Sequence, residues 1–370
     1  MINRKRSLGF AAAAIAAAGA VTAICFGDAL GLVRSAAQPA DTISAAPFGA
    51  TSRPVEVLQG ASAWLTPLPG GLKALRGKVV IVNFWTYSCI NSLRALPYLR
   101  AWNARYASKG LAVIGVHAPE FGFEKDPAKV RLATAQLRVA YPNLQDNDYA
   151  VWRDFANQGW PGIYFIDAHG KIRGYRLGEG GYGEGERLIR KLLSEAGQNL
   201  AGVPVAPIEG KGIEAAADWA DMGSPEAYLG YDKAVDFASR GGIRKDAMHA
   251  YASAAALSLN QWDLAGSWKV GGEYAALQSG PGTVRFRFHA RDAHLVLGGA
   301  PDGQPIRFRV TLDGRAPGAS HGVDTDAAGW GDVKEDRLYQ LIRQPGAIAD
   351  RTVTIEFSRP GARAYVFTFG

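Results

Sequence analysis

The chain contains only two cysteines among its 370 residues. Cys25 lies in an alanine-rich, apolar segment near the N-terminus, so Cys89 is the one thiol in the remainder of the chain. Cleavage of that segment would remove Cys25, and insertion into lipid would keep it away from Cys89. The sequence therefore predicts no internal structural disulfide, even in an oxidising compartment where disulfides are permitted.

Other site signatures are also missing. His289 and His294 are five residues apart in strand-like sequence, so they project to opposite faces and are poor joint metal ligands. Asp324 and Asp326 flank a turn, but two carboxylates do not define a calcium site. The sequence has neither a phosphate-binding glycine loop nor a serine-hydrolase elbow. We therefore predict no bound metal and no cofactor.

The positive charge is modest and dispersed. The formal net charge is +7, and residues 1–37 carry +3 of it, with four basic residues against Asp28. The rest of the chain has no arginine-lysine stripe, so nucleic acid is not an expected partner. Apolar residues make up 48% of the chain, which is enough for a folded core. The length predicts two domains after a targeting segment.

The N-terminus has the pattern of a targeting segment. Arg4, Lys5 and Arg6 precede the uncharged, alanine-rich stretch 7–27, as in a signal peptide. Small residues at 35–37 offer a cleavage site, but the stretch is also about long enough to span a bilayer. Residues 1–37 are therefore predicted to be a signal peptide or a membrane anchor. In either case the body of the chain is expected to be periplasmic, secreted or anchored to the inner membrane.

A linker at 38–54 leads into a region, 55–199, in which strand and helix patterns alternate. The run from Lys78 to Trp85 is apolar and β-branched, which is typical of a buried strand. Helix-ending and helix-starting residues follow at Gly110 and at Asp126-Pro127. The expected elements are a strand at 78–85, a helix at 91–109, a strand at 111–117, a helix at 126–139, a hairpin at 163–177 and a helix at 184–196. This order predicts an α/β sandwich with a mixed central sheet.

After a second predicted linker at 200–222, strands dominate the region 223–370. Several segments alternate apolar with polar residues, as a sheet with one dry face requires. The expected strands are 283–289, 294–297, 306–312, 352–357 and 364–369. We predict an all-β jelly-roll sandwich.

Cys89 directly follows the predicted buried strand and begins a helical pattern. A helix N-terminus stabilises a thiolate, which is the nucleophile in thiol–disulfide exchange. The plain alternative is a cysteine that is packed in the core and has no reactivity. We expect an activated sulfur that faces solvent.

A set of motifs is distributed along the chain: Val-Asn-Phe-Trp-Thr-Tyr-Ser-Cys-Ile-Asn (82–91), Val-Ile-Gly-Val-His-Ala-Pro-Glu-Phe (113–121), Phe-Glu-Lys (123–125), Leu-Gly-Glu-Gly-Gly-Tyr (177–182), Ser-Pro-Glu-Ala-Tyr-Leu-Gly-Tyr (224–231), Leu-Val-Leu-Gly-Gly (295–299) and Ala-Tyr-Val-Phe-Thr-Phe-Gly (364–370). In order and spacing they resemble the thioredoxin fold, and most closely the exported TlpA-like proteins and the periplasmic part of the DipZ family. The resemblance covers about residues 55–370 and implies a thioredoxin-like domain followed by a carbohydrate-binding-module-like β-sandwich. It also implies thiol–disulfide exchange on envelope proteins.

Two departures from the family matter. Its membrane electron-transfer portion is absent, so reducing equivalents would come from a separate membrane donor or a small thiol. Its second active-site cysteine is Ser92 here, so a mixed disulfide on Cys89 would persist until an outside thiol attacks it. Three interpretations stay open: a monothiol exchange enzyme, a redox-inactive binding protein, and a site substituted to trap its partners.

Single residues near Cys89 are also predicted to have roles in this reaction. Ser92 is expected to donate a hydrogen bond to the Cys89 thiolate. Glu120 follows the second strand, where TlpA-like proteins place a buried acid, and it is a candidate proton shuttle; an exposed loop carboxylate is the alternative. His117 either tunes the thiolate or is structural.

Four further residues are expected to meet the substrate. Pro161 matches the cis-proline of the family, whose loop faces the sulfur, and the backbone of Trp160 would pair with a bound strand. Tyr87 and Trp85 would line the approach. For Trp160, packing in the core is the alternative.

Two rival functions depend on other residues. A one-cysteine peroxidase requires an arginine at the sulfur, and Arg94 is the nearby candidate. A non-catalytic glycan-binding module would use an aromatic platform formed by Trp262 and Trp268, with Tyr274 nearby. Tryptophans at the entry to a β-sandwich also serve as core or as a seal between domains.

Overall fold

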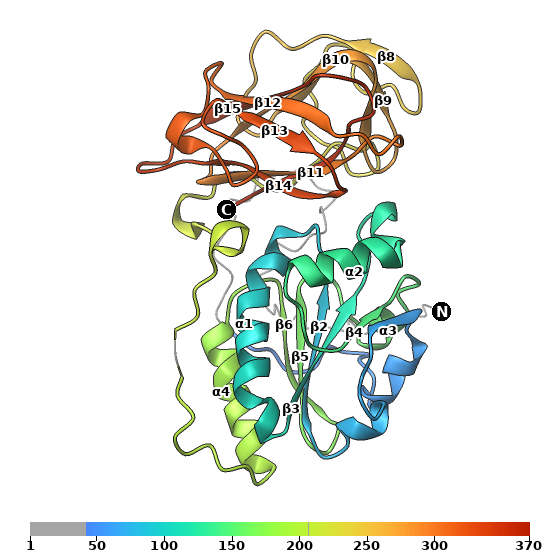
Figure 1. Cartoon of the computed structure of the whole chain (residues 1–370), viewed down its shortest axis with the longest axis vertical. Helices are drawn as coiled ribbons and strands as arrows, with labels where there is room; N and C mark the ends of the chain where they lie inside the picture. Colours follow the sequence, from blue (N-terminus) through green and yellow to red (C-terminus); the bar gives the residue numbers. More distant parts are fainter. Residues whose placement is uncertain (1–41, 206) are drawn as a thin grey trace, which may run out of the picture.

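The computed structural model describes residues 42–205 and 207–370. An α/β part and an all-β part are stacked along the long axis of the molecule, with α1 and α2 next to the all-β part (Figure 1). The predicted signal peptide or anchor, residues 1–37, lies outside the described residues. Across the two described ranges, no helix is both long and apolar enough to cross a bilayer.

The α/β part is built on a six-stranded mixed sheet. Its order is β1-β4-β3-β2-β5-β6, with β2, β3 and β4 parallel and the other pairings antiparallel. All seven residues of β2 are buried, as the β-branched run predicts. Sequence analysis missed the short strands β1 and β4. The bounds are β1 Ala63–Thr66, β2 Val79–Trp85, β3 Leu111–His117, β4 Asn143–Gln145, β5 Gly162–Ile166 and β6 Ile172–Leu177.

α2 begins where capping chemistry predicts, whereas α4 begins two residues before the expected start at Glu184. Asp126 accepts a hydrogen bond from the N–H of Ala128 at 2.8 Å, and Pro127 is the first residue of α2. α2 ends three residues earlier than expected because Arg138 adopts a left-handed φ of 55°. Gly110, with φ of 88°, ends the helical stretch that begins at α1. The bounds are α1 Ile90–Tyr106, α2 Pro127–Gln136, α3 Ala150–Asp154 and α4 Tyr182–Glu195.

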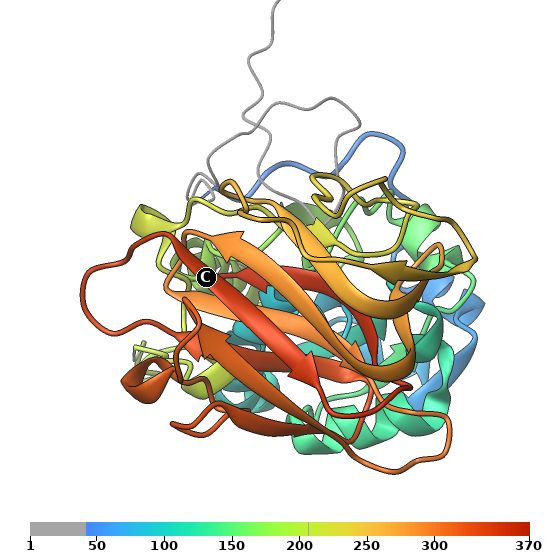
Figure 2. The ribbon, with the colours of Figure 1, turned by 90° about the horizontal axis from the view of Figure 1, so that it is seen from above.

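The all-β part is one curled, sandwich-like sheet of ten strands. Its main path is β13-β12-β15-β10-β16-β11-β14, and β7, β8 and β9 join at its side. All pairings between these strands are antiparallel. Seen from above, the strands cover the α/β part (Figure 2). The bounds are β7 Ala227–Tyr228, β8 Met248–Tyr251, β9 Trp262–Val270, β10 Ala275–Phe288, β11 Asp292–Gly298, β12 Ile306–Leu312, β13 Trp330–Val333, β14 Arg337–Arg343, β15 Arg351–Phe357 and β16 Arg363–Phe369.

Two tryptophans form the centre of the all-β core. Trp262 and Trp268 are fully buried. Their indole N–H groups donate to the carbonyls of Val235 at 2.7 Å and Ala265 at 2.8 Å, so neither ring has a free polar edge. A buried ring cannot stack on a sugar. The predicted glycan platform at Trp262 and Trp268 was therefore wrong, and the core alternative is correct.

The two parts share a continuous core. One buried cluster combines residues of the α/β part with Tyr228, Val296, Leu338 and Tyr365 of the all-β part. Beside this cluster, Arg94 of α1 donates to the carbonyl of Phe369 at 3.3 Å. Because apolar packing and a buried guanidinium join the parts, we expect them to move as one unit.

Replacing Trp268 with alanine should lower the free energy of unfolding by about 3–5 kcal/mol, because it empties a large buried site. Chemical denaturation followed by far-UV circular dichroism would measure this. Trp330 is the matched control: it is 36% exposed and lies beside Arg307 and Arg309. Trp330→Ala should cost about 1 kcal/mol. Equal losses for the two variants would contradict the assignment of Trp268 to the core.

Candidate active site

Cys89 lies at the junction between the central strand and the first helix. β2 ends at Trp85, residues 86–88 turn, and Cys89 is the N-cap of α1. Its carbonyl accepts from the N–H of Leu93 at 3.1 Å. Cys89 is 3% exposed, so the expectation of a solvent-facing sulfur was wrong. The helix N-terminus is placed as predicted, but it is covered by neighbouring side chains.

Ser92 lies in the first turn of the same helix and is fully buried. Its hydroxyl oxygen accepts a hydrogen bond from the N–H of Thr86 at 3.3 Å. A serine hydroxyl has one proton to donate in addition to its lone pairs. Ser92 therefore keeps a donor available within the first turn of α1 while it holds the loop that precedes Cys89.

The loop before β5 has the expected proline. The Trp160–Pro161 peptide bond is cis, so Pro161 is a cis-proline as expected. Trp160 is buried, packs 4.6 Å from the ring of Trp152, and donates from Nε1 to the carbonyl of Ala118 at 3.0 Å. Cys89 belongs to the same buried cluster as these two tryptophans. The fold therefore brings the cysteine and the cis-proline loop into one region.

Glu124 holds the nucleophile loop in place. It lies in the short helix Gly122–Lys125 and is fully buried. Its Oε1 accepts from the hydroxyl of Ser88 at 2.5 Å and from that of Thr86. Its Oε2 accepts from the backbone N–H groups of Phe121, at 3.0 Å, and of Glu120. One carboxyl group thus joins the residues before Cys89 to the loop that carries Glu120.

Glu124 belongs to the motif Phe-Glu-Lys at 123–125, but no role was predicted for it. The local sequence carried little signal: Glu124 lies between Phe123 and Lys125, and Glu120 and Asp126 are nearby carboxylates of the same kind. Burial raises the pKa of Glu124, and the hydrogen bonds from Ser88 and Thr86 oppose that rise. Each hydrogen bond that a buried carboxylate accepts stabilises its ionised form.

Glu120 is the buried acid that the resemblance predicts after β3. Its side chain is 4% exposed. Burial raises its pKa to about 8; Glu226 adds to the rise, while Lys233 and Tyr228 oppose it. The hydroxyl of Tyr228 donates to Glu120 Oε1 at 2.6 Å, and Nζ of Lys233 lies 3.7 Å from the same oxygen. Around pH 8 the protonated and the ionised forms of Glu120 are therefore both populated.

A cavity of about 400 Å³ connects Glu120 with the cis-proline loop. Both acidic and basic side chains line it, together with aromatic rings. Glu120 and Trp160 lie on its wall with Lys233, which comes from the all-β part. The lining residues are Glu120, Tyr149, Trp152, Arg153, Trp160 and Lys233.

Trp85 and His117 are structural. Trp85 is fully buried and donates from Nε1 to Oδ1 of Asn143 at 3.0 Å, so the prediction that it meets substrate was wrong. Its ring packs edge-on to His117 at 5.4 Å. Burial lowers the pKa of His117 to about 3, and the imidazole is neutral at physiological pH. The structural alternative for His117 is therefore favoured.

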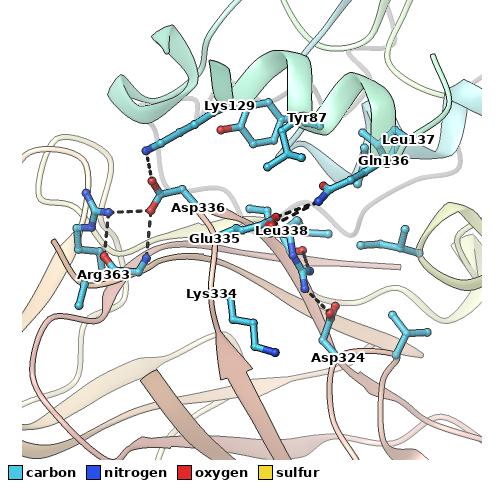
Figure 3. A pocket seen from close by; sticks show the side chains of 18 of the residues that line it. Tyr87, Lys129, Gln136, Leu137, Asp324, Lys334, Glu335, Asp336, Leu338 and Arg363 are labelled. Carbon is cyan, nitrogen blue, oxygen red and sulfur yellow. Dashed lines mark hydrogen bonds and ion pairs between the residues drawn. The ribbon is translucent and has the colours of Figure 1, made fainter. Parts of the chain in front are cut away.

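Tyr87 faces a second cavity, of about 790 Å³, between the two parts (Figure 3). The tyrosine is 5% exposed, and its hydroxyl has no hydrogen-bond partner among the described residues. Across the cavity, Asp336 binds Lys129 of α2 and also accepts from Arg363 at 2.7 Å (Figure 3). Glu335 accepts from Gln136 of α2 at 3.3 Å. Tyr87 thus borders the contact between the two parts.

Arg94, the arginine invoked by the peroxidase alternative, is engaged at this contact. Its guanidinium donates to Oε1 of Glu179 at 3.1 Å as well as to the carbonyl of Phe369. Arg94 is 2% exposed and Glu179 is 5% exposed, so this is a buried ion pair. Such a pair is costly to break because one partner would be left uncompensated. Its observed partners give Arg94 a role in holding α1 to the all-β part.

Comparisons with known proteins cover both parts of the chain. Residues 70–175 match the AhpC/TSA family, and residues 224–370 match the family described as "Thioredoxin like C-terminal domain". Protein DipZ of Mycobacterium bovis is 35% identical over 322 residues, which are 85% of this chain and 42% of DipZ. The chain therefore spans less than half the length of that relative.

Shorter proteins match the α/β part alone. The thiol-disulfide oxidoreductase YkuV of Bacillus subtilis is 27% identical over 143 residues, which are 39% of this chain and 96% of YkuV. Among solved structures, a thiol-disulfide isomerase from Corynebacterium glutamicum covers 36% of this chain and 92% of its own. It is 20% identical, with a TM-score of 0.33.

Replacing Glu124 with leucine should lower the free energy of unfolding by about 3 kcal/mol or more, because it leaves buried donors unpaired. Glu124→Gln is the matched control, since an amide can still accept from the backbone N–H groups and donate to the hydroxyls. We expect the glutamine variant to lose less than half as much in a denaturant titration. A leucine variant as stable as the glutamine variant would show that the Glu124 network does not hold the loop.

Proposed function

This chain belongs to the thioredoxin-like family of DipZ and its relatives, and we propose that it catalyses thiol–disulfide exchange through Cys89 as a single nucleophile. The observation that carries the proposal is the position of Cys89 at the N-cap of α1, in one buried cluster with the tryptophan of the cis Trp160–Pro161 bond. A helix N-terminus stabilises a thiolate at its first residue.

The reaction has two steps. The Cys89 thiolate attacks one sulfur of a substrate disulfide, forms a mixed disulfide and releases the other sulfur as a thiolate. A thiolate from a small thiol or a partner protein then attacks the mixed disulfide, regenerates Cys89 and carries the substrate sulfur away in a new disulfide. No electrons are gained or lost overall, so each cycle exchanges one disulfide for another.

Ser92 and Glu120 have separate roles in this reaction: stabilising the thiolate and exchanging its proton. The hydroxyl proton of Ser92 is available to stabilise the thiolate. Glu120, with a pKa near 8, is suited to exchange a proton with the thiol near neutral pH, because general acid–base catalysis works best when the pKa lies near the working pH.

The 3% exposure of Cys89 favours small disulfides and extended chain segments over the flat surface of a folded protein. We propose that the physiological substrates are thiols or disulfides of envelope proteins. The basic and apolar N-terminal pattern at residues 4–27 supports a location outside the cytoplasm, either secreted or anchored.

The full chain should form a mixed disulfide when it is incubated with glutathione disulfide, and intact-mass spectrometry would detect the adduct. Cys89→Ser should abolish it. Ser92→Cys should shorten the lifetime of the adduct at least about tenfold, because an introduced neighbouring thiol attacks intramolecularly. A Ser92→Ala variant controls for the loss of the hydroxyl and should retain a persistent adduct.

Two results would count against the proposal. One is a chain that forms no adduct, and whose iodoacetamide alkylation begins only above about pH 8, as for an unactivated thiol. The other is an adduct that persists equally in the parent chain and in Ser92→Cys, since the sulfur would then not be placed for exchange across that turn.

A further inference from the structure

The all-β part supplies Lys233 to the cavity that Glu120 lines, and Tyr228 to a hydrogen bond with Glu120. We propose that Tyr228 and Lys233 are positioning residues for Glu120, and that the all-β part is thereby a component of the thiol-exchange site. The inference rests on the role proposed above for Glu120. It assigns the second domain a task in the chemistry itself, in addition to any binding of partners.

Tyr228 is held firmly in the position from which it donates. It ends β7, where its backbone pairs with Val366 of β16. Its ring lies 6.4 Å from that of Phe121, and Nζ of Lys233 lies 4.3 Å from the centre of the ring. The 2.6 Å hydrogen bond to Glu120 is therefore made by a hydroxyl whose direction is set by strand pairing and packing. The same hydroxyl lies 3.3 Å from Oε2 of Glu226, which is a longer contact than its hydrogen bond to Glu120.

The loop that carries Glu120 is fixed at both faces. On its inner face, Glu124 accepts from the N–H of Glu120 and from the hydroxyl of Ser88, the residue before Cys89. On its outer face, the N–H of Gly122 donates to Glu273 of the all-β part at 3.1 Å. A displacement of the all-β part would therefore move Glu120 relative to the nucleophile loop.

The groups around Glu120 shift its pKa in opposite directions, so the role of each can be tested by the direction of the shift that its removal causes. Tyr228 and Lys233 favour the ionised carboxylate, and Glu226 and Glu124 disfavour it. Tyr149 and Arg153 line the same cavity. Removing Tyr228 or Lys233 should therefore raise the pKa of Glu120, whereas neutralising Glu226 should lower it. A residue that only packed in the interface would produce no such ordering.

The test is a pH titration of the Glu120 side-chain carboxyl by ¹³C NMR on the full chain, with the resonance assigned through Glu120→Gln. The parent chain should titrate near pH 8. Tyr228→Phe and Lys233→Met should each move the midpoint up by about one pH unit, as expected for loss of a hydrogen bond or of an opposite charge. Glu226→Gln should move it down. The pH dependence of Cys89 alkylation by iodoacetamide should follow the same order.

Two control variants perturb the same interface without touching Glu120. Tyr274→Phe removes a hydroxyl from a tyrosine that packs on Tyr365. Lys129→Gln removes the ion pair with Asp336. Both should leave the midpoint of Glu120 where it is in the parent chain, and circular dichroism would confirm that every variant is folded.

The outcomes separate this inference from the proposed function. Midpoints that stay unchanged in Tyr228→Phe and Lys233→Met, or that shift equally in the controls, would overturn the positioning role. Midpoints that move as expected without a matching change in Cys89 alkylation would overturn the claim that the all-β part acts on the thiol. A chain that forms no mixed disulfide at all would instead refute the exchange reaction, whatever the Glu120 titration shows.

Discussion

The arrangement of the site depends on the burial of one carboxyl group. Glu124 accepts hydrogen bonds from two hydroxyls of the nucleophile loop and from two backbone N–H groups of the loop after β3. Because Glu124 is fully buried, water cannot replace its carboxylate as the acceptor for these donors. Loss of any of these hydrogen bonds would leave a buried polar group unpaired, which is costly. The residues before Cys89 and the backbone of Glu120 are therefore positioned together.

The all-β part is built onto the outside of the same loop. Phe121 and Phe123 pack against Tyr365 at 5.0 and 4.9 Å, so the cover over the loop is aromatic and apolar. The polar contacts of Tyr228 and Glu273 reach the loop at defined atoms. The contact of Tyr228 is partly buried and that of Glu273 is exposed, so the all-β part meets the loop both within this cover and at its edge. The all-β part thus forms one side of the cavity that Glu120 lines.

A single thiol in this setting implies a particular kind of chemistry. In the proposed reaction Ser92 cannot attack a mixed disulfide, so release of the substrate would depend on an outside thiol, and that thiol would set the lifetime of the adduct. The low exposure of Cys89 selects which thiols can reach it. In that proposed reaction Glu120, whose pKa is raised by burial to about 8, would exchange the proton of the thiol.

The sequence by itself determined the features that depend on neighbouring residues: the buried strand β2, the start of α2 at Asp126-Pro127, the end of the first helical stretch at Gly110, and the position of Cys89 at a helix N-terminus. Turn and capping chemistry acts over a few residues, so these features can be predicted without coordinates. Tertiary structure alone decided that Trp262 and Trp268 are core, that Glu124 gathers four donors, and that Tyr228 meets Glu120 across 108 positions of sequence. Burial and long-range pairing depend on how the two parts pack, and no local pattern encodes that packing.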